Sequence, residues 1–289
     1  MAEFSLKELL SFCTTKIDAQ VDEKRMSFGT GFFFNLILNE KSMVPVIITN
    51  KHVACNKQNL TFYLSQEDKE GNPAFTSPIK LTLHKEDLKK SLYEHPDPEV
   101  DLCAIAVNPI ITKAKTMGYK PFYRTFNNAN IATKEQLESL EGIEEVEMIG
   151  YPNALWDKVH NMPIVRKGIT ATWPVLDFNG KREFLIDAAC FPGSSGSPVF
   201  ICNTGMYYSK KHKDTMLGDR LLLLGIQYAV PIRTVEGSIV KKTIDEVDVK
   251  FEDRYEVKTE SMLNLGYIIK AECILDLIPI FKKELGFDE

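Results

Sequence analysis

The chain has 289 residues, of which 44% are hydrophobic and 26% charged; these globular values exclude disordered, collagen-like and coiled-coil classes. Its 35 basic and 40 acidic residues give a net charge of −5, so no basic field is available to bind nucleic acid. The longest apolar stretch, near 221–232, is too short to cross a bilayer, which needs about 20 residues. We therefore expect neither nucleic acid nor a membrane as a partner.

The beginning of the chain and its cysteines indicate the compartment. Glu3 is acidic, and no basic segment followed by an apolar core marks a secretory signal. None of the six cysteines forms a C-x-x-C pair, so zinc and redox motifs are not indicated. Free thiols in a reducing, cytoplasmic environment are favoured over three disulfides.

The first half of the chain changes from a helical to a strand pattern. Apolar residues at three- and four-residue steps predict an N-terminal helical segment over 1–21. From Ser27 onward, short apolar runs are separated by Gly, Pro, Asn and Asp, which is typical of an all-β sandwich or barrel. The predicted strands of this half, 22–115, are 31–38, 44–49, 60–64, 79–83 and 102–107.

A connector and a second β-rich half follow. In the connector, 116–142, Thr133 and Gln136 form a capping-box pattern that predicts a short helix over 133–140. The predicted strands of the second half, 143–271, are 145–149, 164–171, 182–187, 197–202, 221–230 and 265–271.

Two further segments complete the predicted organisation. The charged, weakly patterned stretch within 231–262 is interpreted as an exposed insertion. The C-terminal segment, 272–289, is predicted to be a helix with one apolar face. This face consists of Ile274, Leu277, Ile278 and Phe281.

The segment Gly193-Ser194-Ser195-Gly196 has the composition of a catalytic turn. Flanking glycines allow unusual backbone angles, so that several N–H groups can point toward one position beside an exposed serine hydroxyl. The alternative is an ordinary Ser/Gly-rich surface loop.

A serine nucleophile needs a base and an orienting carboxylate. Of the five histidines, His52 is distinguished because it follows an apolar strand at the point where a loop begins. Asp101 opens the apolar run that follows it, where a carboxylate must be hydrogen-bonded. A structural role remains the alternative for any single histidine.

The order His52, Asp101, Ser195 is that of the chymotrypsin-like peptidases. The surrounding segments resemble motifs of trypsin-like serine peptidases with the chymotrypsin fold, and are similar to the bacterial, intracellular-type high-temperature-requirement proteases. The matching segments are 29–34, 48–53, 101–105, 149–152, 193–199, 224–226 and 264–270. Together they extend over nearly the whole chain.

The resemblance implies two six-stranded antiparallel β-barrels with the active site between them. His52 would act as general base, Asp101 would orient it, and Ser195 would attack the peptide carbonyl. The backbone N–H groups of Gly193 and Ser195 would form the oxyanion hole. The implied function is a serine endopeptidase that acts on protein or peptide substrates, with no cofactor and no metal.

Two positions depart from the secreted members of this family. The residue before the nucleophile is Ser194, whereas in those enzymes an aspartate pairs with a new N-terminus after zymogen cleavage. The residue after the histidine is Val53 instead of a disulfide-bonded cysteine. Both differences agree with a cytoplasmic enzyme.

The resemblance also suggests where substrate side chains bind. Ala189 stands where trypsin-type enzymes have an acid, so no preference for Lys or Arg is indicated. Tyr228 and Ala229 would pair with the substrate backbone. Val230 would shorten the pocket, beside Gly266 on the last strand, and favour small or aliphatic residues.

Other functions remain open at this stage. A catalytically silent or gated module could use the same fold to bind peptides or partners, or the chain could be a binding domain in a larger assembly. A nucleotide site is not indicated, because Gly29-Thr-Gly31 lacks the third glycine of the dinucleotide pattern.

Overall fold

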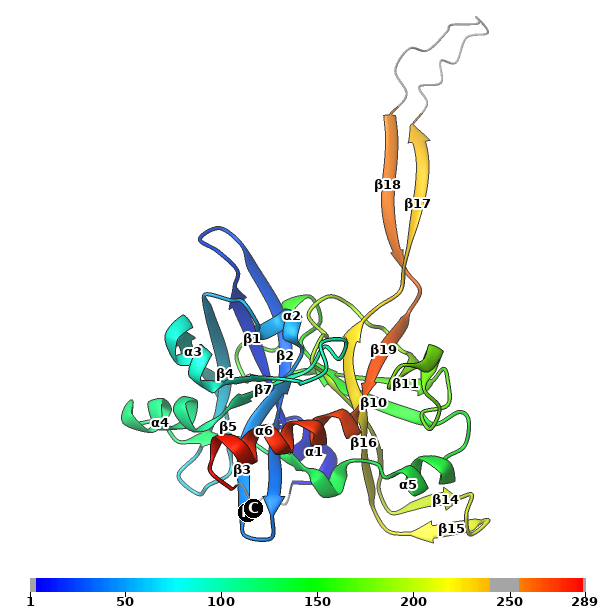
Figure 1. Ribbon diagram of the computed structural model, residues 1–289, viewed down its shortest axis with the longest axis horizontal. Helices are drawn as coiled ribbons and strands as arrows, with labels where there is room; N and C mark the ends of the chain where they lie inside the picture. Colours follow the sequence, from blue (N-terminus) through cyan, green and yellow to red (C-terminus); the bar gives the residue numbers. More distant parts are fainter. Residues whose placement is uncertain (1–3, 240–254, 288–289) are drawn as a thin grey trace, which may run out of the picture.

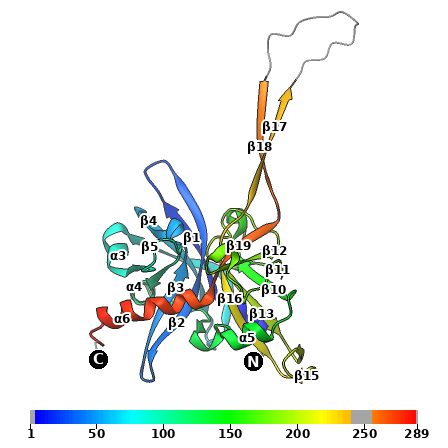
Figure 2. The ribbon, with the colours of Figure 1, turned by 45° about the vertical axis from the view of Figure 1, so that its right-hand side comes forward.

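The computed structural model describes residues 4–239 and 255–287 and consists of two β-sheet halves that lie side by side (Figure 1). The predicted all-β class is confirmed, because helices are few and short in the described residues. A two-stranded hairpin projects far from the second half, in both views (Figures 1 and 2).

The first half is a nine-stranded sheet with the order β5-β4-β1-β2-β3-β7-β6, in which β8 pairs with β4 and β9 with β2. Its strands are β1 (Thr14–Gln20), β2 (Met26–Asn39), β3 (Ser42–Thr49), β4 (Asn59–Glu67), β5 (Pro73–His84), β6 (Leu92–Glu94), β7 (Cys103–Ala106), β8 (Pro121–Phe122) and β9 (Phe126–Asn127). It differs from the expected closed six-stranded barrel, because the described residues leave the ladder unpaired between β5 and the three-residue β6.

The N-terminal prediction needs a correction. Only α1 (Leu6–Leu10) is helical, with Ser5 and Glu8 in a capping box, and the segment Thr14–Gln20 forms strand β1 instead of a helix. The segment 14–17 is rich in β-branched residues, which favour extended backbone, and Ile17 faces the core of the first half. Pairing with β2 and β4 therefore outweighs the local helical periodicity.

The second half is a closed barrel with the order β10-β11-β12-β19-β16-β13, which confirms the predicted six-stranded barrel. Its strands are β10 (Glu145–Gly150), β11 (Ile164–Thr170), β12 (Glu183–Asp187), β13 (Pro198–Asn203), β16 (Arg220–Ala229) and β19 (Leu265–Lys270). Each pairs with its neighbours in antiparallel register.

Two hairpins extend the second half. One joins β14 (Met206–Ser209) to β15 (Asp214–Leu217), and the other joins β17 (Ile232–Ile239) to β18 (Tyr255–Met262). The second hairpin lies in the predicted insertion, and the part of that prediction that falls on 240–254 lies outside the described residues.

Helices connect and cover the strands. The α-helices after α1 are α2 (Lys51–Ala54), α3 (Lys85–Ser91), α4 (Asn108–Thr116), α5 (Lys134–Ser139) and α6 (Ile278–Glu284). The 3-10 segments are η1 (Asn128–Asn130), η2 (Pro152–Ala154), η3 (Phe178–Gly180) and η4 (Ala271–Leu277). Helix α5 is the predicted connector helix, with the capping box between Thr133 and Gln136 in place.

The hydrophobic core connects the two halves. Each half has its own cluster, and a third cluster brings Phe32 and Phe34 of β2 together with Phe200 of β13. The predicted apolar face of the C-terminal helix enters this shared cluster through Ile274 and Phe281, so η4 and α6 return from the second half to pack on the first (Figure 1). The shared core fixes the cleft between the halves.

Candidate active site

His52 lies where β3 ends and the short helix α2 begins. Asn50, two residues before His52, is fully buried. Its side-chain N–H donates to the Asp101 carbonyl at 2.8 Å. This bond ties the start of α2 to the segment before β7, so the two predicted residues come together although 49 positions separate them in the chain.

The carboxylate of Asp101 binds His52 twice. One oxygen accepts the His52 backbone N–H at 3.0 Å, and the other accepts Nδ1–H of the ring at 2.5 Å. Burial alone raises the pKa of Asp101, but the hydrogen bond from the His52 ring, its charge and nearby backbone N–H groups outweigh burial and lower the pKa below 3.8. The carboxylate thus stays ionised and leaves Nε2 of the ring free for a proton from the cleft.

Ser195 lies in a turn that only glycine permits on either side. Gly193 and Gly196 have φ values of 87° and 89°. A Cβ on Gly193 would lie 2.6 Å from the Tyr151 carbonyl oxygen, and one on Gly196 would lie 1.9 Å from the Thr30 carbonyl oxygen. Both glycines are therefore required by backbone angle and by close contact.

The backbone of this turn leaves two donors free. Ser194 N–H donates to the Phe191 carbonyl and Gly196 N–H to the Gln227 carbonyl, at 3.0 and 2.8 Å. Within 4–239 and 255–287, the N–H groups of Gly193 and Ser195 have no acceptor. Two unpaired donors beside a serine are the arrangement that an oxyanion needs.

The Ser195 hydroxyl donates to the Tyr228 carbonyl, with 3.4 Å between Oγ and O. No hydrogen bond in the described part of the chain joins this hydroxyl to His52. The hydroxyl is thus turned away from the base in this structure, and in enzymes such a bond often forms only when substrate binds.

Thr30 on β2 connects the two halves at this turn, a role that the sequence analysis did not assign. Its N–H donates to the Ser195 carbonyl at 2.8 Å, and its hydroxyl donates to the Gly193 carbonyl at 3.0 Å while accepting Tyr151 N–H at 3.1 Å. The sequence feature that could have indicated this role is the position of Thr30 between two glycines of the first matching motif. Periodicity alone does not predict a contact between residues that are 163 positions apart.

The residues predicted to bind substrate gather on the second half. Gly266 lies against Cys190, whose sulfur would be 2.7 Å from a Cβ at this position. Val230 is partly buried and packs against the core cluster that contains Cys190. Ala229 pairs with β19 beside a bulge, and Ala189 is exposed.

Arg166 on β11 is a charged neighbour of this region that the sequence analysis missed. Its guanidinium donates to the Ala189 carbonyl, and two of its other nitrogens, Nε and Nη2, are buried with no acceptor among the described residues. Burial lowers the pKa of Arg166, although the neighbouring Cys190 opposes this effect. The wall next to Ala189 therefore carries a positive charge instead of the acid of trypsin-type enzymes.

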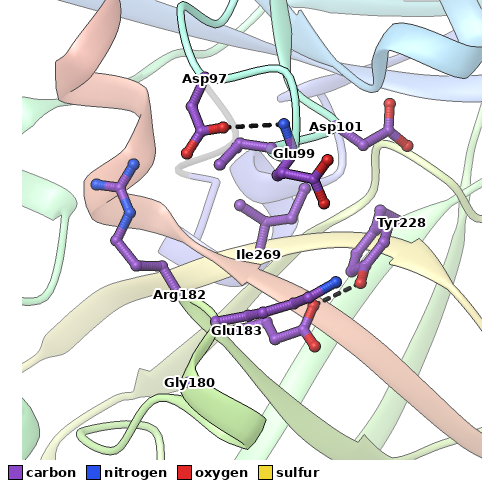
Figure 3. Close-up of a pocket in the computed structure, with 10 residues that line it drawn as sticks. Asp97, Glu99, Asp101, Gly180, Arg182, Glu183, Tyr228 and Ile269 are labelled. Carbon is purple, nitrogen blue, oxygen red and sulfur yellow. Dashed lines mark hydrogen bonds between the residues drawn. The ribbon is translucent and has the colours of Figure 1, made fainter.

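A cavity of about 280 Å³ lies beside Asp101, between the two halves (Figure 3). Asp97 and Glu99 line it from the first half, and Glu183 and Tyr228 line it from the second. The Tyr228 hydroxyl donates to Glu183 at 2.5 Å, and burial together with this carboxylate raises the pKa of the phenol. The tyrosine is thereby held as one wall of the cleft.

Two further observations concern metal binding and membrane-spanning helices. In residues 4–239 and 255–287, no group of three His, Cys, Asp or Glu side chains could hold a metal ion. None of the described helices has the length and apolar character needed to span a membrane.

Comparisons with known proteins identify the family of the chain. The model of the trypsin-like peptidase domain family matches residues 29–206, which is more than half of the chain. No curated protein matches.

Similar solved structures include the Rv3671c protease from M. tuberculosis, at 14% identity and a TM-score of 0.43, covering 91% of this chain and 78% of that one. The serine endoprotease from Yersinia pestis has 14% identity and a TM-score of 0.46, covering 98% and 69%. Tobacco etch virus protease has 14% identity and a TM-score of 0.41, covering 76% and 69%. On the family match, the chain belongs to the trypsin-like peptidase domain family and is a serine peptidase.

Proposed function

We propose that this protein is an endopeptidase that cleaves peptide bonds through His52, Asp101 and Ser195. The observation that carries the proposal is the convergence of two independent parts. The first half supplies an imidazole held by a carboxylate, and the second half supplies a serine beside two unpaired backbone donors. Each part alone has structural explanations, but together they would supply the nucleophile, the base and the oxyanion site that acyl transfer needs.

The proposed reaction proceeds in two steps. Nε2 of His52 takes the proton of the Ser195 hydroxyl as Oγ bonds to the substrate carbonyl carbon, and the resulting oxyanion accepts the N–H groups of Gly193 and Ser195. The imidazolium then gives its proton to the departing amine, which leaves an acyl ester on Ser195. Water, deprotonated by the same imidazole, then attacks the ester carbon; the bond to Oγ breaks, the imidazolium returns its proton to Ser195 Oγ, and the acid product is released.

Asp101 has a positioning and electrostatic role in both steps. Its bond to Nδ1–H selects the tautomer in which Nε2 can accept a proton, and its negative charge stabilises the imidazolium. Before the first step the Ser195 hydroxyl must turn from the Tyr228 carbonyl toward His52, which requires a rotation about one side-chain bond.

We propose that the residue before the cleaved bond is small or aliphatic. Val230 and Cys190 narrow the region in front of Gly266, and no carboxylate stands at Ala189. The Arg166 guanidinium beside Ala189 also repels a substrate lysine or arginine. Tyr228 and Ala229 would pair with the substrate backbone, and preceding side chains would enter the cavity next to Asp101 (Figure 3).

The cysteines support a reducing compartment. All six, at positions 13, 55, 103, 190, 202 and 273, are buried free thiols. Burial raises the pKa of Cys190 to about 11, which keeps this thiol protonated and unreactive near the proposed pocket. We therefore propose a cytoplasmic location.

A gated peptidase is the second candidate, and one observation favours it. The Ser195 hydroxyl is bonded to the Tyr228 carbonyl rather than to His52, as a resting state that awaits substrate or a regulatory partner would have it. Gating would change when the site acts and not the residues that act.

A fluorophosphonate probe tests the proposal directly, because it labels an activated serine covalently. We expect the wild-type protein to be labelled and Ser195→Ala to be unlabelled. Ser194→Ala is the matched control, because Ser194 is fully buried one residue away and its label should remain. A folded wild-type protein that resists the probe but becomes labelled with added peptide would support gating; labelling that persists in Ser195→Ala would contradict the assignment.

A further inference from the structure

Lys16 on β1 is a buried charge in an aromatic surrounding that the proposed mechanism does not use. The residue is 2% exposed, and its ammonium lies 4.9, 4.8 and 4.5 Å from the ring centres of Phe28, Tyr63 and Trp156. The ammonium pairs with Asp18, whose other carboxylate oxygen accepts the Tyr63 hydroxyl at 2.5 Å. Each ring face attracts the cation, so that loss of any one ring weakens the stabilisation of this buried charge.

The rings come from both halves of the molecule. Phe28 and Tyr63 belong to β2 and β4 of the first half, whereas Trp156 belongs to the loop 151–162 between β10 and β11 of the second. The cluster of Lys16, Asp18, Phe28, Tyr63 and Trp156, which we call the lysine cage, is therefore closed only when this loop docks on the first half. Tyr63 and Trp156 also contact each other edge to face, with 5.5 Å between ring centres.

The charged groups around the cage make Lys16 sensitive to its surroundings. Burial lowers the pKa of Lys16 to about 8, and Lys158 of the loop and Lys80 of β5 act in the same direction. The Asp18 carboxylate and the faces of the rings favour the cation and oppose these effects. We therefore expect that only a side chain of the same charge and similar length can replace Lys16.

Loop 151–162 has two more anchors on the first half. The Tyr151 hydroxyl donates to the Thr14 carbonyl at 3.5 Å, and the Asn161 side chain donates to the Ser65 hydroxyl at 3.0 Å. The loop thus belongs to the second barrel by sequence but is fastened at its start, middle and end to β1 and β4.

The start of this loop also touches the oxyanion site. Asn153 N–H donates to the Pro192 carbonyl, with 2.6 Å between N and O. In a trans peptide the C=O and N–H bonds point in opposite directions, so this bond orients the Pro192–Gly193 peptide with the Gly193 N–H facing away from the loop, on the side where no acceptor among the described residues lies. A loop that moved would release this peptide to rotate.

A second contact reaches the same turn from the residue beside Lys16. Lys16 and Thr30 are directly opposite each other in the antiparallel β1–β2 pair, so their side chains share one face of the sheet. The Thr30 hydroxyl donates to the Gly193 carbonyl, and the Lys16 ammonium holds Trp156. One patch of the first half therefore fixes both peptides that flank Gly193.

We propose that Lys16 and Trp156 are positioning residues for the oxyanion hole, because they lock loop 151–162 in the place where it directs the Gly193 N–H toward the substrate oxygen. This inference rests on the proposed function, since it assigns these residues to the site of Ser195. Its test is chosen so that the two can fail separately.

The first experiment measures the rate of fluorophosphonate labelling at rising probe concentration. Lys16→Met and Trp156→Leu should lower the maximal labelling rate by about 10- to 100-fold, less than the full loss of an oxyanion donor, while the half-saturating concentration changes less than about twofold. Lys16→Arg should restore most of the rate, because arginine keeps the charge and stacks on rings. Lys80→Met is the matched control and should label like the wild type, since Lys80 is exposed and loss of its charge removes a repulsion on Lys16 while the three rings and Asp18 stay in place.

The second experiment measures hydrogen–deuterium exchange and does not depend on activity. Both Lys16→Met and Trp156→Leu should speed exchange of amides in 151–162 and 191–194 and leave β13 and β16 unchanged. Unchanged exchange in these two segments, or a Lys16→Arg protein that labels as slowly as Lys16→Met, would overturn the inference. A wild-type protein that is never labelled would reject the proposed function, and exchange alone would then decide whether the cage positions the loop.

Discussion

The two halves of the molecule contribute to the site by different means. The first half holds His52 with the side chain of Asp101, through two hydrogen bonds that are already formed. The second half presents Ser195 through its backbone, in a turn that depends on the left-handed conformation of Gly193 and Gly196. The Thr30 hydroxyl of the first half connects these two parts of the site through its hydrogen bond to the Gly193 carbonyl.

This difference predicts how each half fails. A site held by side-chain hydrogen bonds is disrupted when one functional group is changed, even if the shape of the side chain is kept. A site formed by backbone N–H groups is insensitive to such changes. It is disrupted by a single methyl group that the turn cannot accommodate.

Replacing Asp101 by asparagine should have the largest effect. The amide keeps the shape but does not select the required His52 tautomer or stabilise the imidazolium, so kcat should fall by about 10⁴-fold. Peptide hydrolysis measured under saturating substrate gives this value. Asp97→Asn, in the same loop but on the rim of the cavity, should stay within about twofold of the wild type; equal losses in both variants would remove Asp101 from the site.

Adding one methyl group to Gly193 should lower kcat nearly as much as the loss of one oxyanion-hole N–H donor would. Gly193→Ala places a Cβ against the Tyr151 carbonyl and shifts the N–H, so kcat should fall by about 10²- to 10³-fold. Gly205→Ala is the control, because Gly205 has a similar φ of 84° but open space around it.

Gly205→Ala should lower the free energy of unfolding by roughly 1–2 kcal/mol through backbone strain, and Gly193→Ala should lower it further because of its contact with the Tyr151 carbonyl, as thermal or denaturant melting would show. Only the variant at position 193 should lose activity. An active Gly193→Ala protein would mean that the turn tolerates the methyl group and that the comparison between the halves is wrong.

Removing the link between the halves should have a smaller effect. Thr30→Val keeps the shape but leaves the Gly193 carbonyl and Tyr151 N–H without their buried partner, which should destabilise the protein by about 1–3 kcal/mol. Because the turn keeps its glycines, kcat should fall only about tenfold. Thr61→Val loses a partly exposed hydrogen bond to Thr82. It should destabilise the protein less than Thr30→Val and leave kcat unchanged.

The pH dependence of stability should show the smallest change. Because the folded-state pKa of Asp101 lies below its usual 3.8, its ionised form stabilises the fold above that pH, and the contribution is lost as the pH falls through the folded-state pKa. The difference in free energy of unfolding between wild type and Asp101→Asn should therefore persist at pH 5 and shrink below 3.8. A difference that grows toward acid would reverse the assigned direction of the pKa.

The sequence predicted those features that follow local patterns. Apolar runs and their spacing revealed five of the nine strands of the first half and the six barrel strands of the second, and the capping pair Thr133–Gln136 revealed helix α5. The loop of the proposed nucleophile was recognisable because glycines on both sides of Ser195 indicate backbone angles that other residues avoid. The order of His52, Asp101 and Ser195 was sufficient to suggest the family.

Other features depended on contacts between residues far apart in the chain. The segment 14–20 has an ambiguous local pattern and became a strand because β2 and β4 were available to pair with it. Thr30, Arg166 and Lys16 are ordinary residues in their own strands, and no periodicity marks them. Their roles arise from partners on the other half or across the second barrel.

By itself, then, the sequence determined the class of fold and the three residues that we propose to carry the chemistry, because residue type and spacing encode both. Only the tertiary structure decided how the oxyanion donors are oriented, since a peptide group points where its neighbours hold it. In this protein those neighbours, Thr30 on β2 and Asn153 at the start of a caged loop, come together only when the two halves pack.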